Sequence, residues 1–196
     1  ARVHRKKKDA SMIKMLADLN NDIIDVAISG GSTGAFMASS LFMLGRIEGI
    51  SKPGLASLLP TSSEHKFLLT DLGANVEAKP DDLVNYAKLG QLYMKYIYKI
   101  DEPSVALLNV GIEETKGNKV YKEAHKMIKE EVANFKGNIE ARNILEHRFD
   151  VVIADGFAGN ILLKSIEGVA SSLGKMIKGI FLENFITKIS ALLVKK

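Results

Sequence analysis

The feature that most limits how this chain can fold is a recurring order of a short apolar run, a loop and a helix-forming segment. The apolar runs lie at residues 25–29, 55–59, 67–71, 105–110 and 150–155. Continuous apolar strands that alternate with helices are typical of a parallel sheet with helices on both faces. We therefore predict an α/β fold over residues 1–196: a single domain with three layers (αβα) and a mostly parallel sheet.

Helices are predicted between and after these runs. Asp9 or Ser11 is suited to cap a helix over residues 12–19, because either side chain can accept a hydrogen bond from a free backbone amide. Pro80 is suited to open another helix through Tyr96, since proline fits the first helical position. The remaining helices are predicted at 35–44, after Asn118, and from Asn160 to the C-terminal region, with a possible break at Glu183–Asn184.

The composition excludes several classes of chemistry. With 46% hydrophobic and 26% charged residues, the chain reads as a soluble globular protein. It contains no cysteine, which rules out disulfides, thiolate nucleophiles and cysteine-bound zinc. Its four histidines lack partners at the spacing of a metal site or a catalytic triad. We predict no metal and no cofactor.

The charge and the aromatic content limit the kinds of partner that can be predicted. A formal net charge of +4 favours anionic partners without naming one. Tryptophan is absent and aromatic residues do not alternate with basic ones, so the stacking platforms of nucleic-acid-binding proteins are missing. Uninterrupted apolar stretches stay shorter than the roughly 18 residues of a membrane-spanning helix. We predict neither a nucleic-acid partner nor a transmembrane span.

Three loops are expected between a strand and a helix, where free backbone amides and the positive helix end favour an anion. In the first, glycines let the backbone approach a phosphate closely and hydroxyls add hydrogen-bond donors. A tight strand-to-helix turn explains the same glycines about equally well. The residues predicted to bind phosphate are Gly31, Ser32, Thr33, Gly34, Asn118 and Gly156.

Two further side chains are candidates for catalysis. Lys116 follows a predicted strand, so it should lie at the sheet edge, where its charge could stabilise a phosphate or a developing oxyanion. The alternative is a solvated surface lysine. Asn160 follows the loop at 156–159 and offers a neutral donor near a helix start, with a simple N-cap as the alternative.

Six ordered motifs resemble one family. They are "RKKKDASM", "ISGGSTGAFMASSLFMLGRIEGISKPGLASLLPT", "LLTDLGANVEAKPDDL", "VALLNVGIEETKGN", "FKGNIEARNIL" and "DVVIADGFAGNILLKSIEG". Together they cover nearly all of the chain and resemble the PlsX-type phosphate acyltransferases. The resemblance implies a fold similar to the isocitrate and isopropylmalate dehydrogenases, and an activity that moves a fatty acyl group from acyl carrier protein to inorganic phosphate for phospholipid synthesis.

The resemblance also implies roles and surroundings. Lys116 and Asn160 occupy the positions that the family's pattern marks as catalytic, with Ser32, Thr33 and Asn118 helping to hold phosphate. Because phosphate is itself the nucleophile, no serine or cysteine acyl-enzyme is needed. The family is homodimeric, cytoplasmic and peripherally associated with the inner face of the membrane. The family's first strand and its last glycine-rich segment are missing, so we expect a piece truncated at both ends.

The C-terminal segment at 161–196 carries apolar residues at helical spacing with lysines between them. One interpretation is a helix pair in the core or at a dimer interface. The other is an amphipathic pair whose apolar side enters the membrane surface while the lysines contact lipid headgroups. The residues predicted to face the membrane are Ile177, Ile180, Phe181 and Phe185.

The basic residues near the start are predicted to dock the acidic acyl carrier protein, although a solvated charge run is the commoner explanation. They are Arg5, Lys6 and Lys7. Two other functions stay open at this point. One is a short-chain phosphotransacylase that uses coenzyme A thioesters, and the other is a non-catalytic dimeric scaffold on the membrane surface.

Overall fold

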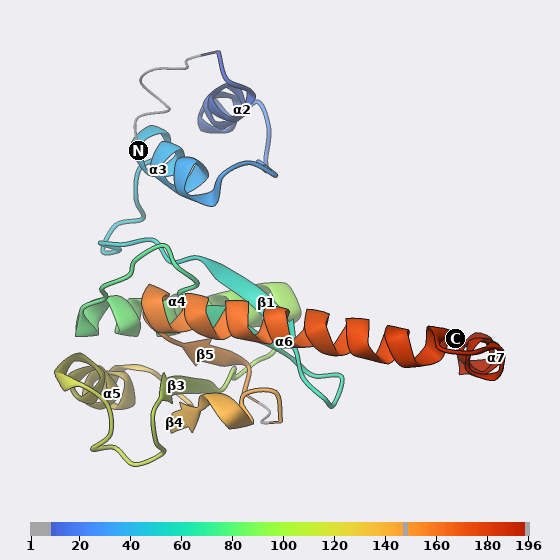
Figure 1. Ribbon diagram of the computed structural model, residues 1–196. Helices are drawn as coiled ribbons and strands as arrows, with labels where there is room; N and C mark the ends of the chain where they lie inside the picture. Colours follow the sequence, from blue (N-terminus) through green and yellow to red (C-terminus); the bar gives the residue numbers. More distant parts are fainter. Residues whose placement is uncertain (1–8, 147–148, 195–196) are drawn as a thin grey trace.

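A five-stranded sheet forms the centre of the computed structural model, which describes residues 9–146 and 149–194 (Figure 1). The strand order across the sheet is β1-β2-β5-β3-β4. The strands are β1 (Ala56–Pro60), β2 (Lys66–Thr70), β3 (Val105–Asn109), β4 (Phe135–Glu140) and β5 (Val151–Ile153). β2, β5, β3 and β4 are mutually parallel, whereas β1 pairs antiparallel with β2. The mostly parallel sheet is therefore confirmed.

Helices precede, connect and follow these strands. Their bounds are α2 (Ser11–Asn20), α3 (Thr33–Met43), α4 (Pro80–Tyr98), α5 (Lys119–Glu131), the 3-10 turn η1 (Ala141–Asn143), α6 (Gly156–Leu182) and α7 (Phe185–Val194). α4 and α5 cover one face of the sheet and the first half of α6 crosses the other (Figure 1). The three-layer prediction is confirmed.

Alternating side chains of the strands fill two separate cores. In β5, Val151 and Ile153 pack with buried residues of α4 and α5, such as Leu83 and Ile128. Val152 points to the opposite face, where Leu162 of α6 packs. Successive side chains of a strand point to opposite faces, so an uninterrupted apolar run places one apolar set in each core. This explains why β2, β3 and β5 appear in the sequence as continuous apolar runs, whereas β4 (FKGNIE), which alternates polar and apolar residues, is not among the strands predicted from the sequence.

The N-terminal region differs from the prediction in two ways. Residues 25–29 form no strand; Val26 is 69% exposed and Ile28 is 86% exposed. A strand needs a neighbouring strand to satisfy its backbone groups, and within the described residues this segment has none. Helix α2 forms as expected, but its N-cap is Ala10 and no side chain caps it, so the predicted cap at Asp9 or Ser11 is wrong.

The C-terminal helices extend away from the sheet. α6 ends at Leu182 and α7 begins at Phe185, so the predicted break at Glu183–Asn184 is confirmed. The end of α6 and all of α7 project past the sheet edge as a C-terminal arm, residues 169–194 (Figure 1). Within the part of the chain that the structure describes, no helix is both long enough and apolar enough to cross a membrane.

Candidate functional site

The carboxyl ends of the parallel strands gather three loops at one edge of the sheet. Residues 71–75 follow β2, residues 110–118 follow β3, and residues 154–155 connect β5 to α6. Ligands of open α/β sheets bind at this edge because loops and helix N-termini meet there. These three loops, together with the start of α6, form the candidate site.

A buried carboxylate organises the loop after β2. Asp71 is fully buried, and its oxygens accept hydrogen bonds from the backbone amides of Leu55 (2.9 Å), Gly73 (3.2 Å), Ala74 (3.0 Å) and Asn75 (2.8 Å). A buried charge is tolerated when several donors surround it. Asp71 therefore fixes the shape of the loop and attaches it to the segment before β1.

The start of α6 packs directly on this loop. The amide of Gly156 donates to the carbonyl of Asn75 at 2.9 Å. A Cβ atom on Gly156 would lie 2.6 Å from that carbonyl oxygen, and one on Gly159 would collide with the carbonyl oxygen of Asp71. Both glycines therefore permit a close backbone approach that no other residue allows. The predicted phosphate ligand Gly156 has this packing role.

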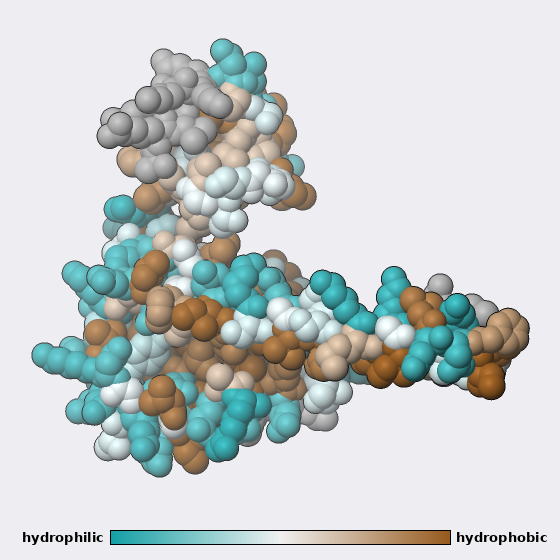
Figure 2. Space-filling model, viewed as in Figure 1, coloured by the Kyte–Doolittle hydropathy of each residue, from teal (hydrophilic) through white to brown (hydrophobic). Residues whose placement is uncertain are grey.

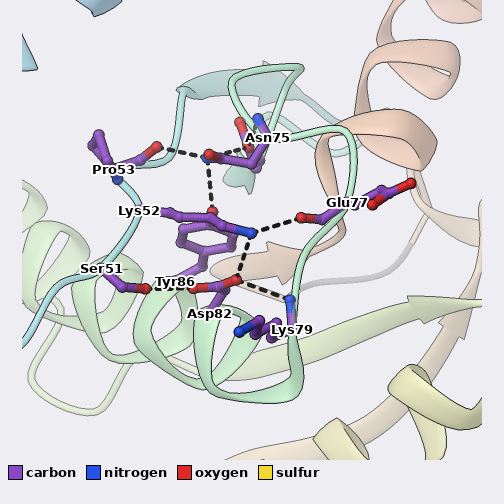
Figure 3. Close-up of polar contacts among 9 residues, drawn as sticks. Ser51, Lys52, Pro53, Asn75, Glu77, Lys79, Asp82 and Tyr86 are labelled. Atoms are coloured by element: carbon purple, nitrogen blue, oxygen red, sulfur yellow. Dashed lines mark hydrogen bonds and ion pairs between the residues drawn. The ribbon is translucent and has the colours of Figure 1, made fainter.

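The side chain of Asn75 links the same loop to α4 (Figure 3). Its Nδ2 lies 2.8 Å from the carbonyl of Pro53, 3.1 Å from an Asp71 oxygen and 2.9 Å from the hydroxyl of Tyr86. Burial raises the pKa of Tyr86 well above its usual range, and nearby Asp71 adds to the rise. The phenol therefore stays neutral, and its oxygen can accept the amide hydrogen bond.

A second buried carboxylate secures the start of α4 (Figure 3). Asp82 accepts hydrogen bonds from the hydroxyl of Ser51 (2.7 Å) and the backbone amide of Lys79 (2.8 Å), and Lys52 Nζ lies 3.1 Å away. Burial raises the pKa of Asp82, but these three donors outweigh burial and hold the pKa below its usual value. Lys52 also donates to the carbonyl of Glu77 at 2.8 Å. This hydrogen bond connects the segment before β1 to the loop between β2 and α4.

The loop after β3 carries the candidate cation. Lys116 is exposed, and its backbone carbonyl accepts a hydrogen bond from Asn109 Nδ2 at 3.2 Å. Among the described residues, its ammonium group forms no ion pair. Asn118 caps α5, since its Oδ1 accepts from the amide of Tyr121 at 3.0 Å. An ammonium group without an ion pair among the described residues thus lies two residues before the uncharged N-cap of α5.

A buried pair of side chains supports this loop from beneath. His125 Nδ1 lies 2.9 Å from Asn138 Oδ1, and Asn138 Nδ2 donates to the carbonyl of Glu113 at 2.8 Å. At the loop surface Glu114 pairs with Lys129 at 2.6 Å, and this hydrogen bond lowers the pKa of Glu114. The loop that bears Lys116 is therefore held by α5 and β4 together.

The N-terminus of α6 is already occupied by a carboxylate. Asp155 is its N-cap, and Oδ1 accepts from the amide of Ala158 at 2.7 Å. The amide of Asp155 donates to the hydroxyl of Tyr121 at 3.1 Å. Burial raises the pKa of Tyr121 far above its usual range, so that hydroxyl remains protonated. Asn160 lies in the second turn of α6, so it is not the N-cap.

Some of the predicted site residues line two hollows on opposite sides of α6, whereas Lys116, Gly31, Ser32 and Gly156 line neither. A hollow of about 570 Å³ on the β3 side contains Gly117, Asn118 and Asp155. A second hollow of about 540 Å³ contains Thr33, Gly34 and Asn160, together with parts of the loop after β2. The structure therefore groups Asn160 with the α3 residues, and Asn118 with the loop that carries Lys116.

The glycine-rich segment at 30–34 leads into α3 without a preceding strand. Ser32 is the N-cap of α3, and its Oγ lies 3.4 Å from the amide of Ala35. The amide of Gly31 donates to Ser29 Oγ at 3.2 Å. Gly31 and Ser32 are exposed, and the first residues of α3, Thr33 and Gly34, line the second hollow.

The remaining predicted residues lie elsewhere. Ile177, Ile180 and Phe185 are 54%, 61% and 75% exposed on the C-terminal arm, whereas Phe181 is half-buried. The predicted docking residues Arg5, Lys6 and Lys7 lie outside the described residues. In the described ranges 9–146 and 149–194, no three His, Asp or Glu side chains come together as a metal site.

Several residues that shape the site escaped sequence reasoning. Asp71, Asp155 and Tyr121 act through partners that lie elsewhere in the chain, and so do His125 and Asn138. For Asp155 a local signal existed, because an aspartate directly before a helix is a strong N-cap. For Asp71 the signal was an aspartate at the end of an apolar strand, followed by a glycine-containing turn.

Comparison with known proteins assigns the chain to a family. Residues 1–196 match the family model described as "Fatty acid synthesis protein". The "Phosphate acyltransferase" of Lysinibacillus sphaericus is 48% identical over 195 residues, which cover 100% of this chain and 59% of that protein. The protein of the same name from Staphylococcus haemolyticus is 45% identical, with coverages of 100% and 60%. The chain thus spans about 60% of the length of these relatives.

Solved structures agree in fold. A phosphotransacetylase from Streptococcus pyogenes superposes with a TM-score of 0.60 at 17% identity, covering 82% of this chain and 54% of that one. The EutD phosphotransacetylase from Staphylococcus aureus gives a TM-score of 0.53 at 17% identity, with coverages of 74% and 49%. Because the family model spans the whole chain and the relatives align over nearly all of it, this chain belongs to the fatty acid synthesis protein family, whose curated relatives are called phosphate acyltransferases.

Proposed function

We propose that this protein transfers a fatty acyl group from acyl carrier protein to inorganic phosphate and so forms an acyl-phosphate for phospholipid synthesis. The observation that carries the proposal is the match to phosphate acyltransferases over all of the chain. The loop that bears Lys116 supports it, because an unpaired ammonium group at the carboxyl edge of the sheet suits an anionic co-substrate.

The proposed reaction needs positioning and charge stabilisation more than a protein nucleophile. A phosphate oxygen attacks the thioester carbonyl, the carbon–sulfur bond breaks, and the carrier leaves as a thiol after gaining a proton. Negative charge grows on the carbonyl oxygen in the transition state, so a fixed cation or amide donor lowers the barrier. In this proposal, the ammonium group of Lys116 provides that stabilisation on the β3 side of α6, and the amide group of Asn160 acts on the other side of α6 with the donors of α3.

The charge of the N-cap residue differs among the helices near the site, and this favours some helix N-termini over others for binding phosphate. Asp155 already places a carboxylate at the start of α6, which would repel a phosphate. The N-caps of α5 and α3 are the neutral Asn118 and Ser32. We assign phosphate to the region of Lys116 and Asn118, with Ser32, Thr33 and the glycines at 31 and 34 as a second group of donors beside Asn160.

Single substitutions test the catalytic assignment. Lys116→Ala should lower kcat/KM for acyl-phosphate formation by about 10²-fold or more, the usual effect of removing one oxyanion donor. Asn160→Ala should also lower it, because the second group of donors loses its amide. Lys126→Ala is the matched control, because this lysine is also exposed and makes no ion pair among the described residues. The assay pairs hexadecanoyl-acyl carrier protein with phosphate, and acetyl-coenzyme A serves as the competing donor.

The outcomes separate the alternatives. Loss of activity in both site variants, with the control unchanged, supports the assignment. Full activity in both variants contradicts it. Faster turnover of acetyl-coenzyme A than of the long-chain carrier substrate would instead identify a short-chain phosphotransacylase. Absence of acyl-phosphate with every donor would contradict the proposed function itself.

The C-terminal arm belongs to the same proposal. Nine of its large apolar side chains are more than 40% exposed: Val169, Leu173, Met176, Ile177, Ile180, Leu182, Phe185, Ile186 and Ile189 (Figure 2). Lys175, Lys178 and Lys188 are exposed among them. Apolar residues with interspersed lysines suit an anionic membrane surface. We assign the arm to peripheral association with the inner face of the cytoplasmic membrane.

The remaining expectations are also proposals. The arm's exposed apolar face supports a homodimer as well as membrane contact, since a large exposed apolar patch usually becomes covered. Acyl carrier protein is assigned to the basic residues Arg5, Lys6 and Lys7 on charge alone. Charge reversal at these positions should raise KM for the carrier-linked substrate and leave kcat unchanged.

A further inference from the structure

The hollow of about 570 Å³ beside α6, called the α6 groove below, has a polar end and an apolar body. Asn109, Asn118 and Asp155 line it where the strands end. The rest of the lining is mostly apolar, with Val110, Phe157, Ile161 and Leu162 among its residues. Figure 2 shows apolar surface below α6, on the side where β3 and β4 lie. The volume falls within the range of small-ligand sites, about 300–1,000 Å³.

Three apolar side chains of this groove are unusually exposed for a sheet edge. Val110 is 79% exposed, Phe157 is 59% exposed and Ile161 is 51% exposed. They come from two different elements, the loop after β3 and the first turns of α6, yet they face one hollow. Exposed apolar side chains that converge on a cavity mark a place where an apolar ligand gains free energy by leaving water.

The groove also has a direction. Its lining on α6 runs from Phe157 to Ser165, which is about 12 Å at the helical rise of 1.5 Å per residue. The polar end lies beside Gly117 and Asn118, next in sequence to Lys116. Among the described residues, no lysine or arginine lines the groove. An uncharged alkyl chain therefore suits its body, while the reacting, polar end of the same molecule suits the Lys116 loop.

We infer that this groove binds the alkyl chain of the acyl substrate, with the thioester at the Lys116–Asn118 end and the chain terminus near Ser165. The inference rests on the proposed function and adds where the chain lies and what limits its length. A two-carbon acyl group would leave most of the groove empty. A long chain would cover Phe157 and Ile161 and reach Ser165.

Substitution at the far end tests the inference. Ser165 is exposed on α6, so Ser165→Phe should fill the end of the groove without disturbing the fold. Its matched control is Ser171→Phe, an exposed serine of the same helix that does not line the groove. Acyl-phosphate formation is measured with acyl carrier protein that carries chains of four to sixteen carbons, and binding is measured with a fluorescently labelled dodecanoic acid.

In the unsubstituted protein, each added methylene should improve kcat/KM by up to about fourfold until the groove is full, the factor that corresponds to burying one CH₂ group. Ser165→Phe should lower kcat/KM for the sixteen-carbon chain by at least about tenfold and leave the four-carbon chain within about twofold. It should also weaken binding of the labelled acid by about tenfold. Ser171→Phe should change none of these values.

The contrary outcomes are distinct from failure of the proposed function. An unchanged chain-length profile in Ser165→Phe overturns the groove assignment even when acyl-phosphate forms normally. Equal losses for short and long chains overturn it as well. If no thioester yields acyl-phosphate, the proposed function is contradicted. In that case, binding of the labelled acid to the wild type and to Ser165→Phe is the measurement that tests the groove assignment. If Ser165→Phe instead turns a dimer into a monomer with unchanged acid binding, the groove is an interface between copies, and the inference is wrong.

Discussion

At the residue scale, glycines decide how closely α6 approaches the loop after β2. Gly159 has the carbonyl oxygen of Asp71 where a Cβ would be, and that oxygen belongs to backbone held by the buried Asp71 side chain. Gly168, two and a half turns later, has no atom within 4 Å of a Cβ position. The packing around Gly159 therefore leaves no room for a side chain, whereas the surroundings of Gly168 do.

Alanine at these two positions should have opposite effects. Gly159→Ala should lower the free energy of unfolding by about 1–3 kcal/mol, because α6 must move away from the loop. Gly168→Ala should raise it by about 0.5–1 kcal/mol through higher helix propensity. Urea denaturation followed by circular dichroism measures both. Equal stabilisation by both substitutions would show that the close approach at Gly159 does not matter.

Asp82 should make stability depend on acidic pH. Its donors hold its pKa below the usual value, so its contribution is present above the pKa of the unfolded state, about 3.9. That contribution should be lost as pH falls through the lower folded pKa. Asp82→Ala should cost about 1–3 kcal/mol at pH 7 and flatten the decline below pH 4. Urea midpoints from pH 7 to pH 2 measure both effects.

The matched control for Asp82 is Asp81→Ala, since Asp81 is exposed in the same helical turn. It should change the midpoint at pH 7 by no more than about 0.5 kcal/mol. An equally steep acidic decline in wild type and Asp82→Ala would contradict the role assigned to this carboxylate.

At the element scale, the loop after β3 depends on α5 and β4 for its shape. Asn138, only 9% exposed, connects His125 of α5 to the carbonyl of Glu113 in the loop. Gly117 adopts φ +88, and a Cβ there would lie 2.7 Å from Asn109 Oδ1. The position of Lys116 therefore follows from two elements beside the strand that precedes it.

Removing the Asn138 side chain should loosen this loop selectively. Asn138→Ala should cost about 1–3 kcal/mol of stability, because the buried His125 side chain and the carbonyl of Glu113 lose their partner. Hydrogen exchange should accelerate at residues 111–117 more than in the sheet, measured by mass spectrometry. Asn143→Ala is the control, because the Asn143 side chain forms no hydrogen bond within the described residues. Uniform acceleration across all strands would contradict the local role.

At the scale of the whole molecule, the sheet with its helices and the C-terminal arm differ in how they treat their apolar side chains. The sheet buries its apolar side chains in two cores, whereas the arm leaves its own side chains in water (Figure 2). A helix pair with many exposed apolar residues is stable in such an arrangement only if it is covered by a partner or a lipid surface. The arm is thus the part of the molecule best suited to contact other assemblies.

Vesicle flotation tests the membrane assignment of the arm. The protein should float with vesicles that contain anionic lipid, and Ile186→Asp should reduce the bound fraction by about tenfold, because a charge would enter the apolar side. High salt should weaken binding, since the lysines act through screened charges. Ser171→Asp, outside the exposed apolar residues, should bind more nearly like wild type. Equal flotation of all three proteins would refute the assignment.

Local pattern was sufficient for much of this fold. The runs at 67–71, 105–110 and 150–155 became β2, β3 and β5 because each supplies apolar side chains to both faces of a covered sheet. Pro80 and the break at Glu183–Asn184 marked helix boundaries for equally local reasons. The run at 25–29 has the same local character and is not a strand, because pairing depends on a neighbour.

For the candidate site, too, some features follow from adjacent residues and others depend on the tertiary structure. The sequence alone determined that Lys116 would follow a strand and that Asn160 would lie near the start of a helix, since both facts depend on adjacent residues. Only the tertiary structure decided that α6 separates Asn118 from Asn160, and that Asp71 joins Leu55 to the loop at 73–75. Those relations connect residues far apart in the chain, where packing and hydrogen bonding, and not local propensity, determine which groups meet.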